Sequence, residues 1–346
     1  MVKQNNNTLF AGIIAGLASV VMVYCSQFAL FFPLNLLVIV PIFLIAFAYG
    51  TYASFVATIA ATIAMALFTP TALRIIAPNF HHPFYITFIF LIFYFAPASL
   101  FSWLYTAQKQ KSANITPNHK QQNYYSLGDI FNYIALYLSI ITTIFCLIVS
   151  NDTNVLTDPL IMQLSAQVSQ SLRNASYTIT NSDPELGAAL TSFNGLETYI
   201  ILIVISAIIA STSFFAILTG LYTGLRVAGY KHWLSRQSPI WPRDLRLPMS
   251  TVILFGVSFC LSNIPLNPYL TTASAIFFVV LFIAFMCSGL AFIHYKTKNF
   301  TYRLPLLVGV YLCLFSMFLT PFAAFGITIC GIVATFYKNK TPIQKH

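Results

Sequence analysis

Residues 226–248, RVAGYKHWLSRQSPIWPRDLRLP, set the topology of the chain, because they separate two long apolar runs and carry its densest positive charge. Five of the 17 lysines and arginines lie in this stretch, and Asp244 is its only acidic residue. Trp233 and Trp241 lie among them, and indole rings favour the headgroup layer of a membrane. Lysine and arginine collect on the cytoplasmic side of multi-pass membrane proteins. The stretch therefore predicts a cytoplasmic surface loop.

The composition excludes a soluble globular protein. Of the 346 residues, 58% are hydrophobic and only 7% are charged, and the mean hydropathy is +0.80. This leaves too little polar surface to cover a water-soluble domain of that length. The net charge of +10 would suit a nucleic-acid partner in a soluble protein, but here the basic residues follow the ends of apolar runs. Membrane topology explains that placement, so we expect a lipid bilayer as partner and no nucleic acid.

The lengths of the apolar runs predict an all-α, polytopic transmembrane bundle. A hydrocarbon core of about 30 Å needs roughly 17 to 25 helical residues per crossing. Pro33 and Pro41 should bend the second crossing or delay its start. Thr320-Pro321 should divide the last apolar run into two short crossings. Ten crossings result: 9–25, 29–47, 51–68, 84–105, 130–149, 197–225, 249–263, 271–292 and the two halves of 304–337.

The whole chain, 1–346, forms a single membrane domain in this interpretation. Residues 9–150 hold the first five crossings and 196–337 the last five, and 338–346 form a cytoplasmic tail. The segment 151–195 is predicted to be extracytoplasmic. Within it Asp158 can cap a helix that begins at Pro159, and apolar residues then recur at helical spacing, as in an amphipathic helix on a membrane surface.

The distribution of charge favours ten crossings over nine. With both termini in the cytoplasm, all lysines and arginines except Arg74 and Arg173 lie inside, which gives net charges of +13 inside and −3 outside. If 304–337 were one tilted helix, the three lysines of the tail would lie outside. The positive-inside rule therefore predicts ten crossings of a bacterial inner membrane with both termini cytoplasmic.

Side chains for chemistry are scarce, and we expect no catalytic residue, cofactor or metal. The six cysteines lie in apolar runs without CxxC spacing, which is typical of buried thiols. The adjacent His81 and His82 diverge from each other, and no third ligand is near them in sequence. With only seven acidic residues, paired carboxylates are not expected. An intramembrane enzyme that uses serine or threonine hydroxyls stays open as an alternative.

Hydroxyl and amide groups within the apolar runs have two interpretations. They can hold an uncharged ligand, or they can bond to helix carbonyls, as such groups do in most membrane bundles. The residues concerned are Asn35, Ser206, Ser211, Thr212, Ser213, Ser262 and Asn263.

Three stretches carry a family resemblance. They are GLYTGLRVAGYKHWLSRQSPIWPRDLRLP at 220–248, SGLAFIHYKTKNFTYRLPLLVGVYLCLF at 288–315 and LVIVPIFLIAFAYGTYASFVATIAA at 37–61. They resemble the YybS-like family, a group of bacterial polytopic membrane proteins of unknown function. That family is remotely similar to the substrate-binding S components of energy-coupling-factor vitamin transporters. The resemblance implies binding or transport of a small molecule.

The first apolar run has the small-residue spacing through which S components dock on their coupling subunit. Ala11 pairs with Ala15, and Gly12 pairs with Gly16, at the spacing of an AxxxA pattern. The resemblance thus implies a docking face for a membrane-protein partner at these four residues. General helix packing is the alternative, because small residues at this spacing are common in membrane helices.

Arg243, Asp244 and Arg246 are the candidate contact residues of the basic loop. Asp244 lies next to Arg243 and two residues from Arg246, so it can orient the loop by ion pairing, or the three can meet a partner. The second interpretation corresponds to another function, that of a non-transporting scaffold in envelope assembly. Such a scaffold would bind a protein or anionic lipid through this loop.

Overall fold

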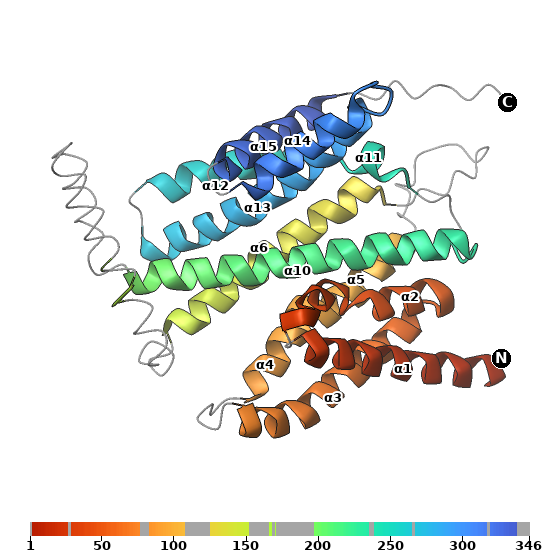
Figure 1. The fold of residues 1–346 in the computed structure, drawn as a ribbon. Helices are drawn as coiled ribbons and strands as arrows, with labels where there is room; N and C mark the ends of the chain where they lie inside the picture. Colours follow the sequence, from red (N-terminus) through yellow and green to blue (C-terminus); the bar gives the residue numbers. More distant parts are fainter. Residues whose placement is uncertain are drawn as a thin grey trace, which may run out of the picture. The chain divides into compact units, whose positions relative to one another are not determined.

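The computed structural model describes residues 2–26, 29–76, 83–107, 125–151, 197–234, 239–264, 267–316 and 319–337, and also 166, 167 and 170. Every regular element within these ranges is a helix (Figure 1). Six of the described helices are long and apolar enough to cross a membrane. Four further apolar helices are shorter: Pro33–Tyr49, Met249–Ser262, Arg303–Leu314 and Thr320–Phe336. The protein is therefore an all-helical, multi-pass membrane protein.

The first four predicted crossings correspond to seven helical elements, because two of the crossings change helix type part-way. The second crossing is a 3₁₀-helix followed by an α-helix, and the fourth contains a short π-helix between two α-helices. The elements are α1 (Val2–Ser26), η1 (Ala29–Leu37), α2 (Val40–Tyr49), α3 (Thr51–Ile76), α4 (Pro83–Phe90), η2 (Leu91–Phe95) and α5 (Ala96–Thr106).

The remaining predicted crossings each correspond to one helix, and the short helix α11 lies in the basic loop. The bounds of the seventh are those predicted, and Thr320-Pro321 begins the last helix, as expected of a proline in a first helical turn. The predicted amphipathic helix in 151–195 and the tail 338–346 lie outside the described ranges. The elements are α6 (Leu127–Asn151), α10 (Glu197–Tyr230), α11 (Trp241–Asp244), α12 (Met249–Asn263), α13 (Pro268–Lys296), α14 (Arg303–Phe315) and α15 (Thr320–Phe336).

The chain forms two compact units, and four helices contribute to both of them. The first unit comprises Met1–Leu136, Thr212–Ile253 and Phe282–His346, and so contains the helices from α1 to α5 together with α11, α14 and α15. The second unit comprises Tyr137–Ser211 and Leu254–Leu281. Helices α6, α10, α12 and α13 each continue from one unit into the other.

Helix α3 shows the distribution of residues expected of a helix in lipid. Its buried side is made of small residues, since Ala53, Ala57 and Ala61 are fully buried. Its other side exposes large apolar side chains, each at least 49% exposed: Phe55, Ile59, Ile63 and Leu67. Water would disfavour such a surface, whereas lipid tails accept it, and small residues allow neighbouring helices to approach closely.

The directions of the first helices follow from contacts within the first unit. Gly12 lies against Ala53 and Gly16 against Ala57, so α1 and α3 run in the same direction. Helix α5 runs in the opposite direction to α3, because Thr58 contacts Phe95 whereas the earlier residue Ser54 contacts the later residue Ser99.

Candidate functional site

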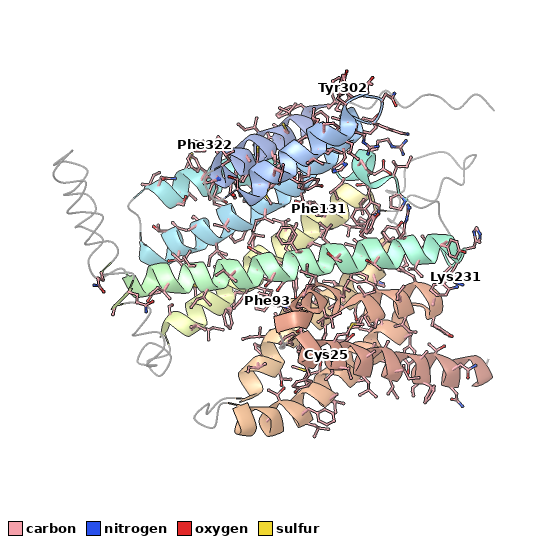
Figure 2. All side chains as sticks on the ribbon, viewed as in Figure 1. Cys25, Phe93, Phe131, Lys231, Tyr302 and Phe322 are labelled. Atoms are coloured by element: carbon pink, nitrogen blue, oxygen red, sulfur yellow. The ribbon has the colours of Figure 1, made fainter. Side chains whose placement is uncertain are left out.

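A π-helix interrupts the fourth crossing at its middle, and a proline explains its position. Pro97 has no N–H to donate to the carbonyl of Phe93, one turn earlier, and its ring would press on that carbonyl in a regular α-helix. The backbone instead widens over Leu91–Phe95, where the Ala96 N–H bonds to Leu91 O, five residues back. Single π-helical turns of this kind are frequent at functional sites. Figure 2 labels Phe93 in this turn.

A second interruption divides the second crossing, and it has the same cause. Pro41 cannot donate to the carbonyl of Leu37, and η1 ends at that residue. Helix α2 then begins at Val40, with Pro41 in its first turn. Of the two prolines expected to bend this predicted crossing or delay its start, Pro41 lies at the break, whereas Pro33 lies inside η1. Both interruptions lie near the middle of their predicted crossings, since η1 and α2 have 9 and 10 residues and α4 and α5 have 8 and 11.

Hydroxyl groups from α3 and α5 bond to one another beside the π-helix. Thr58 Oγ1 lies 2.6 Å from Ser99 Oγ and 3.1 Å from the carbonyl oxygen of Phe95. Ser99 Oγ in turn lies 3.0 Å from the carbonyl oxygen of Ser54. The two hydroxyls have two hydrogens for these three contacts, so one contact always lacks a hydrogen. The network can accept a further hydrogen bond more readily than it can donate one.

The part of α10 that belongs to the first unit contacts η2 and α2. The Tyr94 hydroxyl donates to Thr212 Oγ1 over 3.4 Å, which is a long hydrogen bond. Gly220 lies against the ring of Phe43 and Gly224 against the ring of Phe47, and a larger residue at either position would collide with these rings. Thr212 was one of the polar residues predicted to hold a ligand or to bond to a helix carbonyl. The structure places its hydroxyl within reach of a tyrosine from the π-helix.

In each of α1, η1 and α4, one buried polar group has no hydrogen-bond partner among the described residues. They are Ser19 Oγ on α1, Asn35 Oδ1 on η1 and Thr87 Oγ1 on α4. Ser19 and Thr87 are buried residues. A buried polar group without a partner costs free energy, and in native proteins such groups call for an explanation such as a bound molecule.

Three of the other predicted polar residues bond within their own helices. Ser211 Oγ donates to Ala207 O, and both Ser262 Oγ and Asn263 Nδ2 donate to Phe259 O. These are the helix-carbonyl bonds of the second interpretation. Asn35 therefore differs from them, because its Oδ1 is buried without such a partner in the described part of the chain.

The predicted docking face of the first crossing lies against α3. Gly12, Ala15 and Gly16 are buried, and a Cβ added at Gly16 would overlap the carbonyl oxygen of Ala57. Ala11 alone is half-buried. These small residues therefore allow α1 and α3 to pack closely within the chain, which was the alternative to docking. A partner could reach Gly12 and Gly16 only by displacing α3.

An apolar groove runs along the same two helices. Its volume is about 460 Å³, and all ten lining residues are apolar, among them Leu17 on α1 and Ile59 and Ile63 on α3. It offers no hydrogen-bonding group to a polar ligand. A lipid acyl chain fits its chemistry.

The basic loop forms a short turn of helix, α11, which Asp244 orients. The Asp244 carboxylate accepts from the Arg243 guanidinium at 2.8 Å through one oxygen and from the Ile240 N–H at 2.8 Å through the other. The hydrogen bond with Asp244 raises the pKa of Arg243. The Ser288 hydroxyl of α13 donates to Leu245 O over 3.1 Å, which attaches the loop to that helix. The turn Trp241–Asp244 is thus held by the ion pair that the sequence analysis gave as one alternative.

Arg246 contacts aromatic residues, and sequence reasoning did not identify them. Its guanidinium carbon lies 5.6 Å from the ring centroid of Tyr337 and 5.8 Å from that of Tyr295, and its Nη1 donates to Tyr337 O. Lys296 Nζ lies 3.6 Å from the same Tyr337 centroid. Both tyrosines lie at the ends of apolar runs, where aromatic residues of the membrane interface are expected. This position in the sequence could have identified them as interface residues.

The chain offers few other groups for chemistry. No group of three or more histidine, cysteine or acidic side chains that could hold a metal occurs among the described residues. The six cysteines are free thiols. The pair His81-His82 lies outside the described ranges. No protein-family model matches the chain, and neither does any curated protein or any solved structure.

Proposed function

We propose that the protein binds a small, uncharged, polar molecule within the helices α1 to α5 and carries it across a bacterial inner membrane. The observation that carries this proposal is the pair of interrupted helices, η1–α2 and α4–η2–α5, each broken near the middle of a crossing. Irregular backbone at membrane depth is tolerated where it is buried in protein or lines a cavity, and transporters build their binding sites from such broken helices. The proposal assigns no reaction to the protein.

The absence of charge near these breaks supports an uncharged ligand. The described elements η1, α2, α4, η2 and α5 contain no aspartate, glutamate, lysine or arginine. A charged ligand at that depth would have no counter-charge from these elements, and an unpaired charge in a membrane interior is costly.

The hydrogen-bonding groups support a ligand that donates hydrogen bonds. Thr58 and Ser99 share two hydrogens among three contacts, and the Asn35 carbonyl oxygen is a buried acceptor without a partner among the described residues. A ligand with hydroxyl or N–H groups would supply the missing hydrogens.

The resemblance to the YybS-like family and, through it, to S components agrees with this proposal. We also retain ten crossings with both termini in the cytoplasm and 151–195 outside. The parallel directions of α1 and α3, with α5 opposed to them, support successive crossings. Gly220 and Gly224 of α10 follow the order of Ile39, Phe43 and Phe47 along α2, as expected if the second and sixth crossings run the same way.

The test compares co-purified small molecules, identified by mass spectrometry, between the wild type and the double variant Thr58→Val/Ser99→Ala. We expect the wild type to retain an uncharged molecule. The double variant should retain about tenfold less of it, because the ligand loses its hydrogen bonds to the two hydroxyls, of roughly 0.6–1.5 kcal/mol each. That molecule, added back, should raise the melting temperature of the wild type and leave that of the double variant unchanged.

Thr62→Val is the matched control. Thr62 lies on the same helix as Thr58, but among the described residues its hydroxyl donates only to Thr58 O of its own helix, at 2.8 Å. Its replacement should leave the retained molecule within twofold of wild type. A reproducibly empty wild-type protein with no thermal shift across a panel of uncharged metabolites would contradict the proposal, and so would equal losses in the two variants.

A non-transporting scaffold is the second candidate, and the exposed side of the basic loop favours it. Ile240 is 54% exposed beside the Arg243–Asp244 ion pair, so the ordered turn could meet a cytoplasmic protein. Charge reversal Arg243→Glu should abolish that contact but leave ligand retention unchanged. Arg243 is the better choice for this experiment, because reversal at Arg246 would also remove its contacts with Tyr337.

A further inference from the structure

Two cations meet at one exposed tyrosine ring where α13 and α15 end. Lys296 Nζ lies 3.6 Å from the centroid of the Tyr337 ring, and the Arg246 guanidinium carbon lies 5.6 Å from it. These two distances leave the cations at most about 9 Å apart. Lys296 comes from the last turn of α13, Arg246 from the basic loop and Tyr337 from the residue after α15. The three residues are called the inner cationic cluster.

Aromatic contacts hold both cations in place. The ring of Tyr295 lies 5.8 Å from the Arg246 guanidinium carbon, and the ring of Phe292 lies 5.6 Å from Lys296 Nζ. Phe292 and Tyr337 pack against each other with centroids 5.8 Å apart. Rings and cations at these distances attract each other, so the positions of the two charges are fixed before any ligand arrives.

The local carboxylate is engaged elsewhere. Both oxygens of Asp244 are used within the loop, one by Arg243 and one by the Ile240 N–H. The hydrogen bond from Lys296 lowers the pKa of Tyr337, and the charges of Lys296 and Arg246 lower it further. The tyrosine therefore experiences a net positive potential, and an anion placed between the two cations would be attracted.

The surroundings of the cluster are those of a membrane surface. Phe336, next to Tyr337, is 60% exposed, and the residues at the start of α14, Tyr302 and Leu304, are also exposed. The cluster thus lies where apolar helices end and polar loops begin, at the depth of lipid headgroups. Basic residues at this depth on the cytoplasmic side attract the anionic lipids of that leaflet.

We propose that Arg246 and Lys296 bind the phosphate of an anionic phospholipid of the cytoplasmic leaflet, with the aromatic side chains around Tyr337 against its glycerol and upper acyl carbons. This site is separate from the proposed binding of an uncharged molecule, and it does not depend on it. A phosphate accepts hydrogen bonds from a guanidinium and an ammonium together, and it neutralises the repulsion between the two. The acyl chains would lie along the exposed apolar surface of α14 and α15.

The test measures lipid retention by native mass spectrometry of the full-length protein released from nanodiscs of equal phosphatidylglycerol and phosphatidylcholine. We expect the wild type to retain phosphatidylglycerol preferentially. Lys296→Gln should reduce this retention about fivefold, the effect of one basic residue near an anionic surface. Lys296→Arg keeps the charge and should retain lipid within twofold of wild type. Elution as a monodisperse peak shows that each variant is folded.

Lys231→Gln is the matched control. Lys231 also lies at the interface, at the end of α10 (Figure 2), and its Nζ lies 5.7 Å from the Tyr230 ring, but no second cation is described at that ring. Lys231→Gln removes the same charge as Lys296→Gln, so the general attraction of the protein to an anionic membrane falls equally in both variants. Equal loss of phosphatidylglycerol in Lys231→Gln and Lys296→Gln would overturn the proposal, as would equal retention of the two lipids by the wild type.

A second arm separates a lipid site from a site for a soluble phosphate. Glycerol phosphate is added at millimolar concentration to wild-type protein that carries phosphatidylglycerol in a neutral detergent. Retention of the lipid is expected, because the acyl chains contribute to binding. Complete displacement by glycerol phosphate would show a site for free phosphate compounds and would overturn the assignment to lipid.

Discussion

Replacement of Gly331 by alanine should destabilise the protein by about 2–3 kcal/mol, the upper part of the range for overpacked interiors. Gly331 on α15 lies against α13, where an added Cβ would overlap the carbonyl oxygen of Phe285 and approach the backbone nitrogen of Gly289 to 3.0 Å. Both are backbone atoms, which cannot rotate aside as a side chain can, so the two helices must move apart. Close glycine contacts between helices supply much of the packing attraction in lipid, where no hydrophobic effect drives association.

Thermal unfolding of the detergent-solubilised protein, followed with a thiol-reactive fluorophore, measures this effect. The assay uses a chain that keeps Cys287 and lacks the other five cysteines, because Cys260 is exposed in the folded protein. Cys287 is buried on α13 and becomes reactive when the protein unfolds. Gly326→Ala is the control on the same helix, because nothing lies within 4 Å of an added Cβ there. Its stability should be unchanged or higher by about 0.5–1 kcal/mol. Equal melting temperatures for the two variants would show that α13 and α15 do not meet at Gly331.

Gly16→Ala should have the second large effect, because it separates α1 from α3. Its Cβ would overlap the carbonyl oxygen of Ala57 and lie 2.9 Å from the backbone nitrogen of Ala61. We expect destabilisation of about 1–3 kcal/mol in the same thermal assay. Gly256→Ala on α12 is the control, since its Cβ would have no neighbour within 4 Å.

This variant also distinguishes packing from docking at the predicted small-residue face. If Gly16 packs on α3, the melting temperature falls in the purified protein, with no partner present. If the face serves a membrane-protein partner instead, the purified variant keeps its wild-type melting temperature, and only recovery of the partner from solubilised membranes falls. The second result would contradict the packing of α1 on α3.

The long helices could be predicted from sequence because lipid imposes a simple length requirement. Apolar runs long enough to cross a bilayer are expected to be helical, and the predicted runs 130–149 and 271–292 lie within α6 and α13. The shorter helices α12 and α15 also begin at the predicted residues. Proline positions also indicate where a helix is interrupted. Pro41 marked the break in the second crossing, and the same reasoning at Pro97 would have indicated the π-helix in the fourth.

The candidate sites could not be predicted, because they depend on contacts between distant parts of the chain. Thr58 and Ser99 are ordinary small residues in apolar runs until the antiparallel packing of α3 and α5 brings their hydroxyls to 2.6 Å. The glycine spacing in α1 has the same appearance whether it faces a partner or α3. Arg246 was expected to interact with its sequence neighbour Asp244, but it contacts Tyr337, which lies 91 residues away.

Cysteine labelling of intact cells tests most directly whether the basic loop faces the cytoplasm, on which the direction of every crossing and the leaflet of the proposed lipid depend. The two positions are Tyr230 at the end of α10 and Asn263 at the end of α12, both exposed, each changed to cysteine in a chain without its six native cysteines. A membrane-impermeant maleimide should label Asn263→Cys in intact cells and Tyr230→Cys only in inverted vesicles. Labelling of Tyr230→Cys from outside intact cells would show that the chain is threaded in the opposite direction.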